Sequence, residues 1–152
     1  MVMRCVSTVS FSVVINGKPS SSFIPSRALC QGDPLSPYLF ILISEVLSRN
    51  VDVAVSRGCL HGVRTCRSGP TISHLLFADD SLLFICATTQ NYSVLKKIVD
   101  DYCMASGQEL NVDKSSLFLS PNVSNSLARE ICNTLGMTPT LDHGTYMGLP
   151  SI

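Results

Sequence analysis

Hydrophobic residues recur at helical spacing in three stretches of the chain, and the first stretch, residues 31–56, is the most continuously apolar. Its helically spaced positions are Leu35, Leu39, Leu42 and Val46. Further apolar residues fill in the other sides, so we expect this helix to be buried over most of its circumference. Asp33 or Ser36 can cap the helix. Pro34 or Pro37 suits its first position, where a backbone N–H has no helical partner.

Two further stretches predict amphipathic helices that end at glycines. In residues 89–106 the apolar positions that share one face are Val94, Leu95, Ile98, Val99 and Tyr102. Gly107 follows as a C-terminal stop. A last helix is expected at about residues 123–135, with Leu127, Ile131 and Leu135 on one face and Gly136 at its end.

Alternating or short apolar runs predict antiparallel hairpins between these helices. Residues 6–15 lead through a turn, "NGKPSSS", into a returning strand "SFIPSRAL". In "HLLFADDSLLF", residues 74–84, two apolar runs flank a four-residue break, which indicates a hairpin with both arms in the core. Residues 57–70 are expected to form a loop with at most a short strand, and "SSLFLS", residues 115–120, a further strand. The tail from residue 138 is expected to have no element of its own.

Hairpins and helices without a regular strand–helix–strand alternation indicate the α+β class, with helices packed on one face of an antiparallel sheet. A chain of 152 residues is long enough for one domain and short for two. Only 14% of the residues are charged, against roughly 25% in a typical soluble domain. Either the chain is part of a larger assembly, or its many Ser, Thr and Asn residues make a compact domain polar. We favour the first interpretation.

Charge and cysteine content limit the classes of partner and compartment. Eleven basic and eleven acidic residues balance, so contact with nucleic acid has to be local. The seven cysteines form neither a CxxC motif nor a Cys/His cluster, which favours free thiols in a reducing compartment. The longest apolar stretch, residues 38–43, is too short to span a bilayer. Because no secretory signal is recognisable, we expect an intracellular chain with no membrane contact.

Two neighbouring carboxylates, Asp79 and Asp80, stand between the apolar runs of the predicted 74–84 hairpin. Two carboxylates a few Å apart repel each other unless a cation lies between or beside them. Mg²⁺ or Mn²⁺ would relieve this repulsion, and two such ions held by carboxylates serve nucleotidyl transfer. Two solvated aspartates at a turn would give the same local sequence. A prenyl-diphosphate motif, DDxxD, is excluded because residue 83 is Leu.

Four segments in order resemble the reverse transcriptases of non-LTR (LINE-type) retrotransposons, particularly those of plant genomes. They are "QGDPLSPYLFILISEVLS" (31–48), "FADD" (77–80), "SGQELNVDKSSLFLS" (106–120) and "YMGLP" (146–150). The resemblance covers nearly the whole chain and implies a polymerase palm with RNA-directed DNA polymerase activity in the parent enzyme. It also implies an RNA template, a DNA primer, deoxynucleoside triphosphates and two Mg²⁺ (or Mn²⁺) ions.

The resemblance assigns roles to individual residues. Asp79 corresponds to a ligand of the catalytic metals, and Asp80 to a nearby, less direct contributor. Gln31 and Gly32 correspond to the segment that packs against nucleotide and template, although Gly32 would also suit an ordinary turn. Lys114 corresponds to a lysine near the departing pyrophosphate, as a general acid or charge neutraliser, and a solvated turn lysine is the alternative. Residues 146–150 correspond to the region that grips the primer end.

The chain departs from the family pattern in two ways. Ala28 and Cys30 stand where a glycine and a basic residue are usual, and Cys30 cannot offer a phosphate the contact that Arg would. No Asp or Glu precedes residue 30, so we expect the first catalytic aspartate of the family to have no counterpart here, and likewise the fingers and thumb subdomains. We therefore expect residues 1–152 to be a partial reverse transcriptase domain, palm only, that is inactive alone. The alternatives are a non-enzymatic palm remnant or partner-binding module, and, less favoured, an unrelated metal-dependent phosphotransferase.

Overall fold

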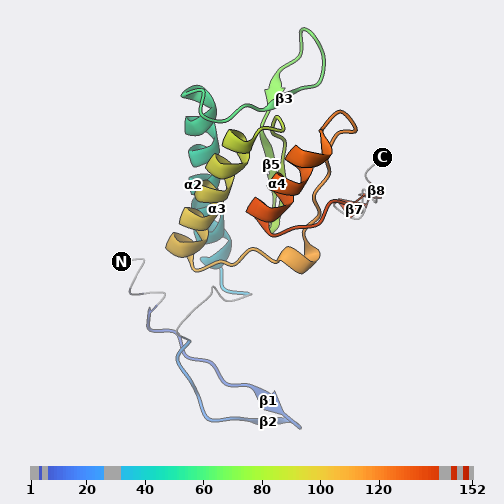
Figure 1. Ribbon diagram of the computed structural model, residues 1–152. Coiled ribbons are helices and arrows are strands. Elements are labelled where there is room, and N and C mark those ends of the chain that lie inside the picture. Colours follow the sequence, from blue (N-terminus) through green and yellow to red (C-terminus); the bar gives the residue numbers. More distant parts are fainter. Residues whose placement is uncertain (1–3, 5–6, 26–31, 141–144, 147–148, 151–152) are drawn as a thin grey trace. The chain divides into compact units, whose positions relative to one another are not determined.

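The computed structural model describes residues 4, 7–25, 32–140, 145–146 and 149–150 (Figure 1). The chain divides into two compact units, residues 1–37 and residues 38–152. The predicted nucleotide-binding residue Gln31 and the departures Ala28 and Cys30 lie outside the described residues.

The N-terminal unit contains a hairpin of two short strands, β1 (Val14–Ile15) and β2 (Lys18–Pro19), paired antiparallel. Asn16 and Gly17, with φ of 52° and 76°, form the two-residue turn. Positive φ at both central residues fits the turn that joins twisted antiparallel strands, which explains the Asn-Gly pair. The hairpin was predicted, but its turn takes two residues rather than the whole of "NGKPSSS". An isolated bridge, Phe11 to Phe23, extends the pairing.

Three helices form most of the second unit: α2 (Ser36–Ser56), which begins at the end of the first unit, α3 (Thr89–Ser106) and α4 (Asn125–Leu135). In Figure 1, α3 lies between α2 and α4, and α3 and α4 are in contact. None of the helices in the described part of the chain is long and apolar enough to cross a membrane.

Local capping explains where α3 and α4 begin and end. The Thr88 side chain accepts a hydrogen bond from the Asn91 backbone N–H, and Ser124 does the same for Leu127. Gly107 and Gly136 close the two helices in left-handed conformation, with φ of 71° and 68°. Such caps satisfy backbone groups that a helix end leaves without partners. The predicted ends of both helices are confirmed.

The strands of the second unit are β3 (Val63–Arg64), β4 (Thr71–Ile72), β5 (His74–Phe77), β6 (Asp80–Leu83), β7 (Thr145–Tyr146) and β8 (Leu149–Pro150). They pair antiparallel as β3 with β4, β5 with β6, and β7 with β8. The α+β class is therefore confirmed, with the strands of the described residues in separate two-stranded ladders. A short 3₁₀ helix, η1 (Val112–Lys114), follows α3.

The main core joins α2, α3 and the β5–β6 hairpin. Its buried members are Leu47, Val51, Ala54, Leu60, Leu95 and Tyr102. Leu76 of β5 and Leu83 of β6 pack against this cluster. A second cluster, made of Tyr92, Leu117 and Ile131, lies between α3 and α4. Since both clusters contain residues of α3, this helix connects the two parts of the core.

A buried amide ties the loop before β3 to the start of α3. Asn91 is buried, its Oδ1 accepts a hydrogen bond from the His61 backbone N–H at 3.3 Å, and its Nδ2 donates to the Cys86 carbonyl at 2.9 Å. A buried amide needs such partners, because an unpaired polar group inside a protein is costly. The bonds hold the chain on either side of the β3–β6 region against α3.

Helix α2 corrects the prediction that it would be buried over most of its circumference. Leu47 and Val51 are buried, but Leu42 and Val46, on the stripe expected to face the core, are 64% and 50% exposed. The helix is apolar on two sides, and only one side has a partner among the described residues. Apolar periodicity alone cannot tell which of two apolar sides is covered.

Other boundaries also differ from the prediction. Residues 115–120 form no strand; within them Leu117 forms an isolated bridge with Pro139. The tail, expected to have no element, contains the β7–β8 pair. The β5 arm of the β5–β6 hairpin is only half in the core: Leu76 packs inward, whereas Leu75 is exposed. The predicted short strand within residues 57–70 is confirmed as β3.

Candidate metal centre

The β5–β6 hairpin places the two aspartates at its turn. The strands pair His74 with Leu83, Leu75 with Leu82, Leu76 with Ser81 and Phe77 with Asp80. Ala78 and Asp79 are therefore the two residues of the turn, and Asp80 is the first residue of β6. Both aspartates are exposed. The sequence-based expectation of a tight hairpin is confirmed, with a turn of two residues instead of four.

Ala78 adopts the left-handed conformation, with φ of 50°. A two-residue link between paired antiparallel strands requires positive φ in the turn, and a residue with a Cβ pays roughly 1 kcal/mol or more for it. Sequence reasoning missed this residue. A two-residue loop length would have revealed it, but the apolar pattern around "FADD" did not fix that length.

Packing at the base of the hairpin fixes its two strands to the helical core. A hydrogen bond of 2.8 Å joins the Ser48 hydroxyl on α2 to Nε2 of His74, the first residue of β5. The Phe84 backbone N–H donates to the Ser73 carbonyl at 2.8 Å and extends the ladder beyond β6. Inward-facing Leu76 and Leu83 supply the apolar contacts. The aspartates thus stand at the free end of a hairpin whose other end is anchored.

The charge of the aspartate pair is not balanced by a protein cation in the part of the chain that the structure describes. The ion pairs there join Glu45 with Arg49, Lys96 with Asp100 and Lys97 with Asp101, all on helices. Within the same residues, no group of three or more His, Cys, Asp or Glu side chains could hold a metal ion. The pair therefore offers two carboxylates, and further oxygen ligands would have to come from water or substrate.

Lys114, the predicted pyrophosphate contact, is an exposed residue at the end of η1. Its backbone N–H donates to the Asn111 side chain at 3.1 Å, which caps the turn. Among the described residues its ammonium forms no ion pair with Asp79 or Asp80. The structure thus explains the conformation of this turn and leaves the amine available.

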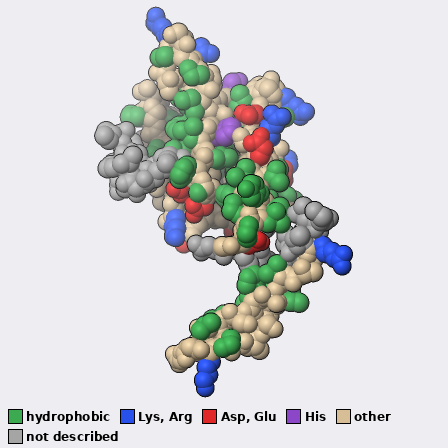
Figure 2. Space-filling model, turned by 180° about the vertical axis from the view of Figure 1, so that it is seen from behind, with side chains coloured by type: hydrophobic (Ala, Val, Ile, Leu, Met, Phe, Trp, Pro, Cys, Tyr) green, Lys and Arg blue, Asp and Glu red, His purple; other side chains and the backbone are tan. Residues whose placement is uncertain are grey.

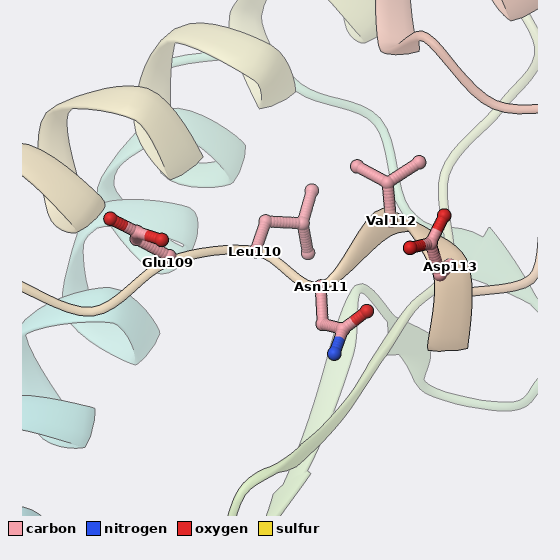
Figure 3. Close-up of a pocket in the computed structure, with 5 residues that line it drawn as sticks. All are labelled: Glu109, Leu110, Asn111, Val112 and Asp113. Atoms are coloured by element: carbon pink, nitrogen blue, oxygen red, sulfur yellow. The ribbon is translucent and has the colours of Figure 1, made fainter.

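A shallow hollow precedes Lys114 along the chain, lined by residues 109–113 (Figure 3). Leu110 and Val112 point to one side of the chain and Asn111 to the other (Figure 3). The carboxylates of Glu109 and Asp113 lie at its two ends (Figure 3). Sequence reasoning had not singled out this hollow.

Gly32 belongs to the N-terminal unit and is exposed, with φ of 93°. A positive φ of this size favours glycine, so the backbone conformation alone explains why residue 32 is a glycine. Asp33 follows directly. Its Oδ1 accepts a hydrogen bond from the Leu35 backbone N–H at 3.1 Å, and its carbonyl oxygen accepts one from the Ser36 backbone N–H at 3.1 Å. Asp33 thus shapes the turn before α2 but does not cap the helix, because its side chain accepts from Leu35, which precedes Ser36, the first helical residue. The other predicted cap, Ser36, is buried, and its hydroxyl forms no hydrogen bond among the described residues.

Comparison with known proteins identifies the class. The family model described as "Reverse transcriptase (RNA-dependent DNA polymerase)" matches residues 2–148. The chain belongs to this family, and its α+β fold agrees with part of a polymerase palm.

Two relatives narrow the comparison. An uncharacterized mitochondrial protein of Arabidopsis thaliana is 56% identical over 68 residues, which are 45% of this chain and 56% of that protein. The retrovirus-related Pol polyprotein from a type-2 retrotransposable element of Drosophila melanogaster is 32% identical over 99 residues, or 65% of this chain and 8% of the polyprotein. The chain thus matches a small part of one relative and about half of the other.

Proposed function

We propose that this chain contributes part of the active site of a non-LTR retrotransposon reverse transcriptase, which adds deoxynucleotides to a DNA primer on an RNA template. The observation that carries the proposal is the position of Asp79 and Asp80. They are adjacent and exposed, at the turn of a hairpin that packs on the helical core, and no ion pair with a described Lys or Arg balances their charge.

Asp79 and Asp80 would hold the metal in this proposal, Asp79 as the direct ligand and Asp80 as the less direct one. Their carboxylate oxygens suit a hard divalent cation, and Mg²⁺ in polymerase sites is held by one or two carboxylates together with water and substrate phosphates. When bound, a pair of such ions supplies an activated 3′-hydroxyl and stabilises the leaving pyrophosphate. The chain's own part is to hold two oxygen ligands at a fixed point of the hairpin.

The remaining predicted residues would act on the substrate. Lys114 would neutralise charge on the departing pyrophosphate or donate a proton to it, for which its exposed ammonium is suited. Gln31 and Gly32 would lie against nucleotide and template, where a residue without a side chain permits close approach of a base or sugar. Residues 146–150 would contact the primer end.

We propose further that the chain does not polymerise alone, since a two-ion site takes more acidic ligands than one aspartate pair provides. The second candidate function is a non-enzymatic palm remnant or partner-binding module. The exposed apolar side of α2 favours it, because such a surface is typical of contacts with other chains.

A primer-extension assay tests the catalytic proposal. The chain is incubated with an RNA template, a DNA primer, deoxynucleoside triphosphates and Mg²⁺, beside Asp79→Ala, Lys114→Ala and the control Lys96→Ala on α3. We expect extension by the wild type no higher than the background without protein. If extension occurs, we expect Asp79→Ala to abolish it and Lys96→Ala to leave it unchanged.

Two outcomes would decide against the proposal. Extension that survives Asp79→Ala would contradict the metal role of Asp79. Binding of the primer–template duplex that is equal for wild type and Asp79→Ala, with and without Mg²⁺, and accompanied by no extension, would favour the non-enzymatic module.

A further inference from the structure

The outer side of α2 carries a stripe of exposed apolar residues that the catalytic proposal does not use. We call it the α2 stripe: Tyr38, Leu42, Val46 and Val53, with exposures of 68%, 64%, 50% and 44%, flanked by Ile41 at 63%. These positions lie opposite the buried Leu47, Val51 and Ala54 of the same helix. Figure 2 shows hydrophobic side chains gathered on the side of the molecule where α2 lies, beside charged side chains.

Two opposite charges stand in the middle of the α2 stripe. Glu45 and Arg49 are four residues apart, so they share its face, and their side chains are 63% and 73% exposed. Arg49 Nε lies 3.9 Å from Glu45 Oε1, at the limit of an ion pair, so both groups can accept a better partner. Between Tyr38 and Val53, this face of α2 therefore has Glu45 and Arg49 near its middle and a second exposed acid, Asp52, towards its C-terminal end.

The Glu45–Arg49 pair is complementary to a second copy of itself in one orientation. If two copies of α2 pack antiparallel about a two-fold axis near residue 47, Glu45 of each copy meets Arg49 of the other, and Leu42 comes beside Val53. In the parallel orientation like charges would meet. We propose that the α2 stripe is an antiparallel docking surface for a second copy of this chain. This proposal is independent of the catalytic one.

Charge and area set the strength of the contact. The chain has a formal net charge of +0, so no long-range repulsion opposes association. Each apolar side chain of the stripe exposes on the order of 100 Å² to solvent. Docking of two copies would therefore bury on the order of 1,000 Å² in total. That area is near the lower limit for a specific interface. A reversible dimer with a dissociation constant roughly in the micromolar range or weaker follows.

Charge reversal tests the docking surface without disturbing the core. Sedimentation velocity is measured over a concentration series for the wild type, for Glu45→Arg, for Arg49→Glu, and for an equimolar mixture of these two variants. Each variant alone places like charges opposite each other, so we expect its dissociation constant to rise roughly tenfold or more. In the mixture the two variants are complementary, and we expect a heterodimer about as strong as the wild-type dimer.

Lys97→Glu on the outer side of α3 is the matched control. It changes the net charge as much as Arg49→Glu does and also removes an ion pair between residues four apart. We expect it to dimerise like the wild type, and circular dichroism should report the same helix content for every variant, because the altered side chains are exposed.

Three results would overturn the proposal. A wild type that stays monomeric at all concentrations would show that no second copy docks on the stripe. Association that neither variant weakens would place the contact elsewhere. Loss of association in both variants without recovery in their mixture would rule out the antiparallel pairing. If another part of the same chain covered the stripe, the wild type would likewise stay monomeric.

Discussion

The helical core and the turn of the β5–β6 hairpin belong to the same unit. The side chains of the core have packing and hydrogen-bond partners within the protein, whereas those of the turn lack them among the described residues. In the core, apolar residues are covered and the buried amide of Asn91 has hydrogen-bond partners. At the turn, Asp79 and Asp80 are exposed and without a protein cation among the described residues. The difference indicates that stability and chemistry reside in separate residues, so substitutions should affect one property without the other.

The largest expected effect is on the buried side of α2. Leu47→Ala should lower the free energy of unfolding by about 2–4 kcal/mol, because it removes buried methyl groups and leaves a cavity. Leu42→Ala makes the same chemical change on the exposed side and should cost less than about 0.5 kcal/mol. Urea denaturation at low protein concentration measures both. Equal costs would mean that the two sides of α2 are equally covered.

The next effect is on the buried amide. Asn91→Ala should cost about 1–3 kcal/mol, because the His61 N–H loses the Asn91 acceptor and the Cys86 carbonyl keeps only its bond from the Thr88 N–H. Asn133→Ala on the exposed side of α4 is the matched control and should stay within about 0.5 kcal/mol of the wild type. The same denaturation experiment applies. A cost for Asn91→Ala no larger than the control's would show that these bonds add nothing to stability.

Replacing alanine by glycine should have opposite signs at the turn and in a helix. Ala78→Gly relieves the left-handed backbone and should stabilise the hairpin by up to about 1 kcal/mol. Ala105→Gly on the exposed side of α3 should destabilise by about 0.5–1 kcal/mol, since glycine is a poor helix former. Thermal unfolding compares the two. Destabilisation by both would argue against a left-handed residue at the turn.

The smallest effect is confined to alkaline pH and comes from the second core cluster. Burial, and secondly the nearby Cys132 thiol, raise the pKa of Tyr92 above its ordinary value. Folding therefore favours the protonated phenol, and this contribution is present below about pH 10 and lost as pH rises through the raised pKa. The free energy of unfolding, measured as a function of pH, should fall above about pH 10, and Tyr92→Phe should make this fall smaller. Tyr38→Phe, at an exposed site, should not reduce it.

Local signals explain which parts of the fold the sequence predicted. The ends of α3 and α4 depend on a side-chain cap and a glycine within a few residues; the glycines were predicted, whereas the caps Thr88 and Ser124 were not. The Asn-Gly turn of β1–β2 and the β5–β6 hairpin likewise follow from neighbouring residues. In each case the interactions that decide the structure are close in sequence.

Contacts between distant residues explain what the sequence did not predict. The bridge between Leu117 and Pro139 replaces a strand, and nothing within residues 115–120 specifies that partner. The covered side of α2 depends on where α3 and the hairpin pack. For the site, the sequence identified the exposed aspartates, but the left-handed Ala78 and the anchoring bond from Ser48 to His74 needed the strand register and the packing of α2.

Binding of Mn²⁺ at the hairpin turn tests the central claim most directly. Mn²⁺ is titrated into the ¹⁵N-labelled chain, and line broadening is followed for wild type, Asp79→Asn, Asp80→Asn and the control Asp100→Asn on α3. We predict broadening centred on residues 78–81, lost in Asp79→Asn, weakened in Asp80→Asn and unchanged in Asp100→Asn. No broadening at the turn, or broadening that survives Asp79→Asn, would contradict the assignment of this pair as the metal site.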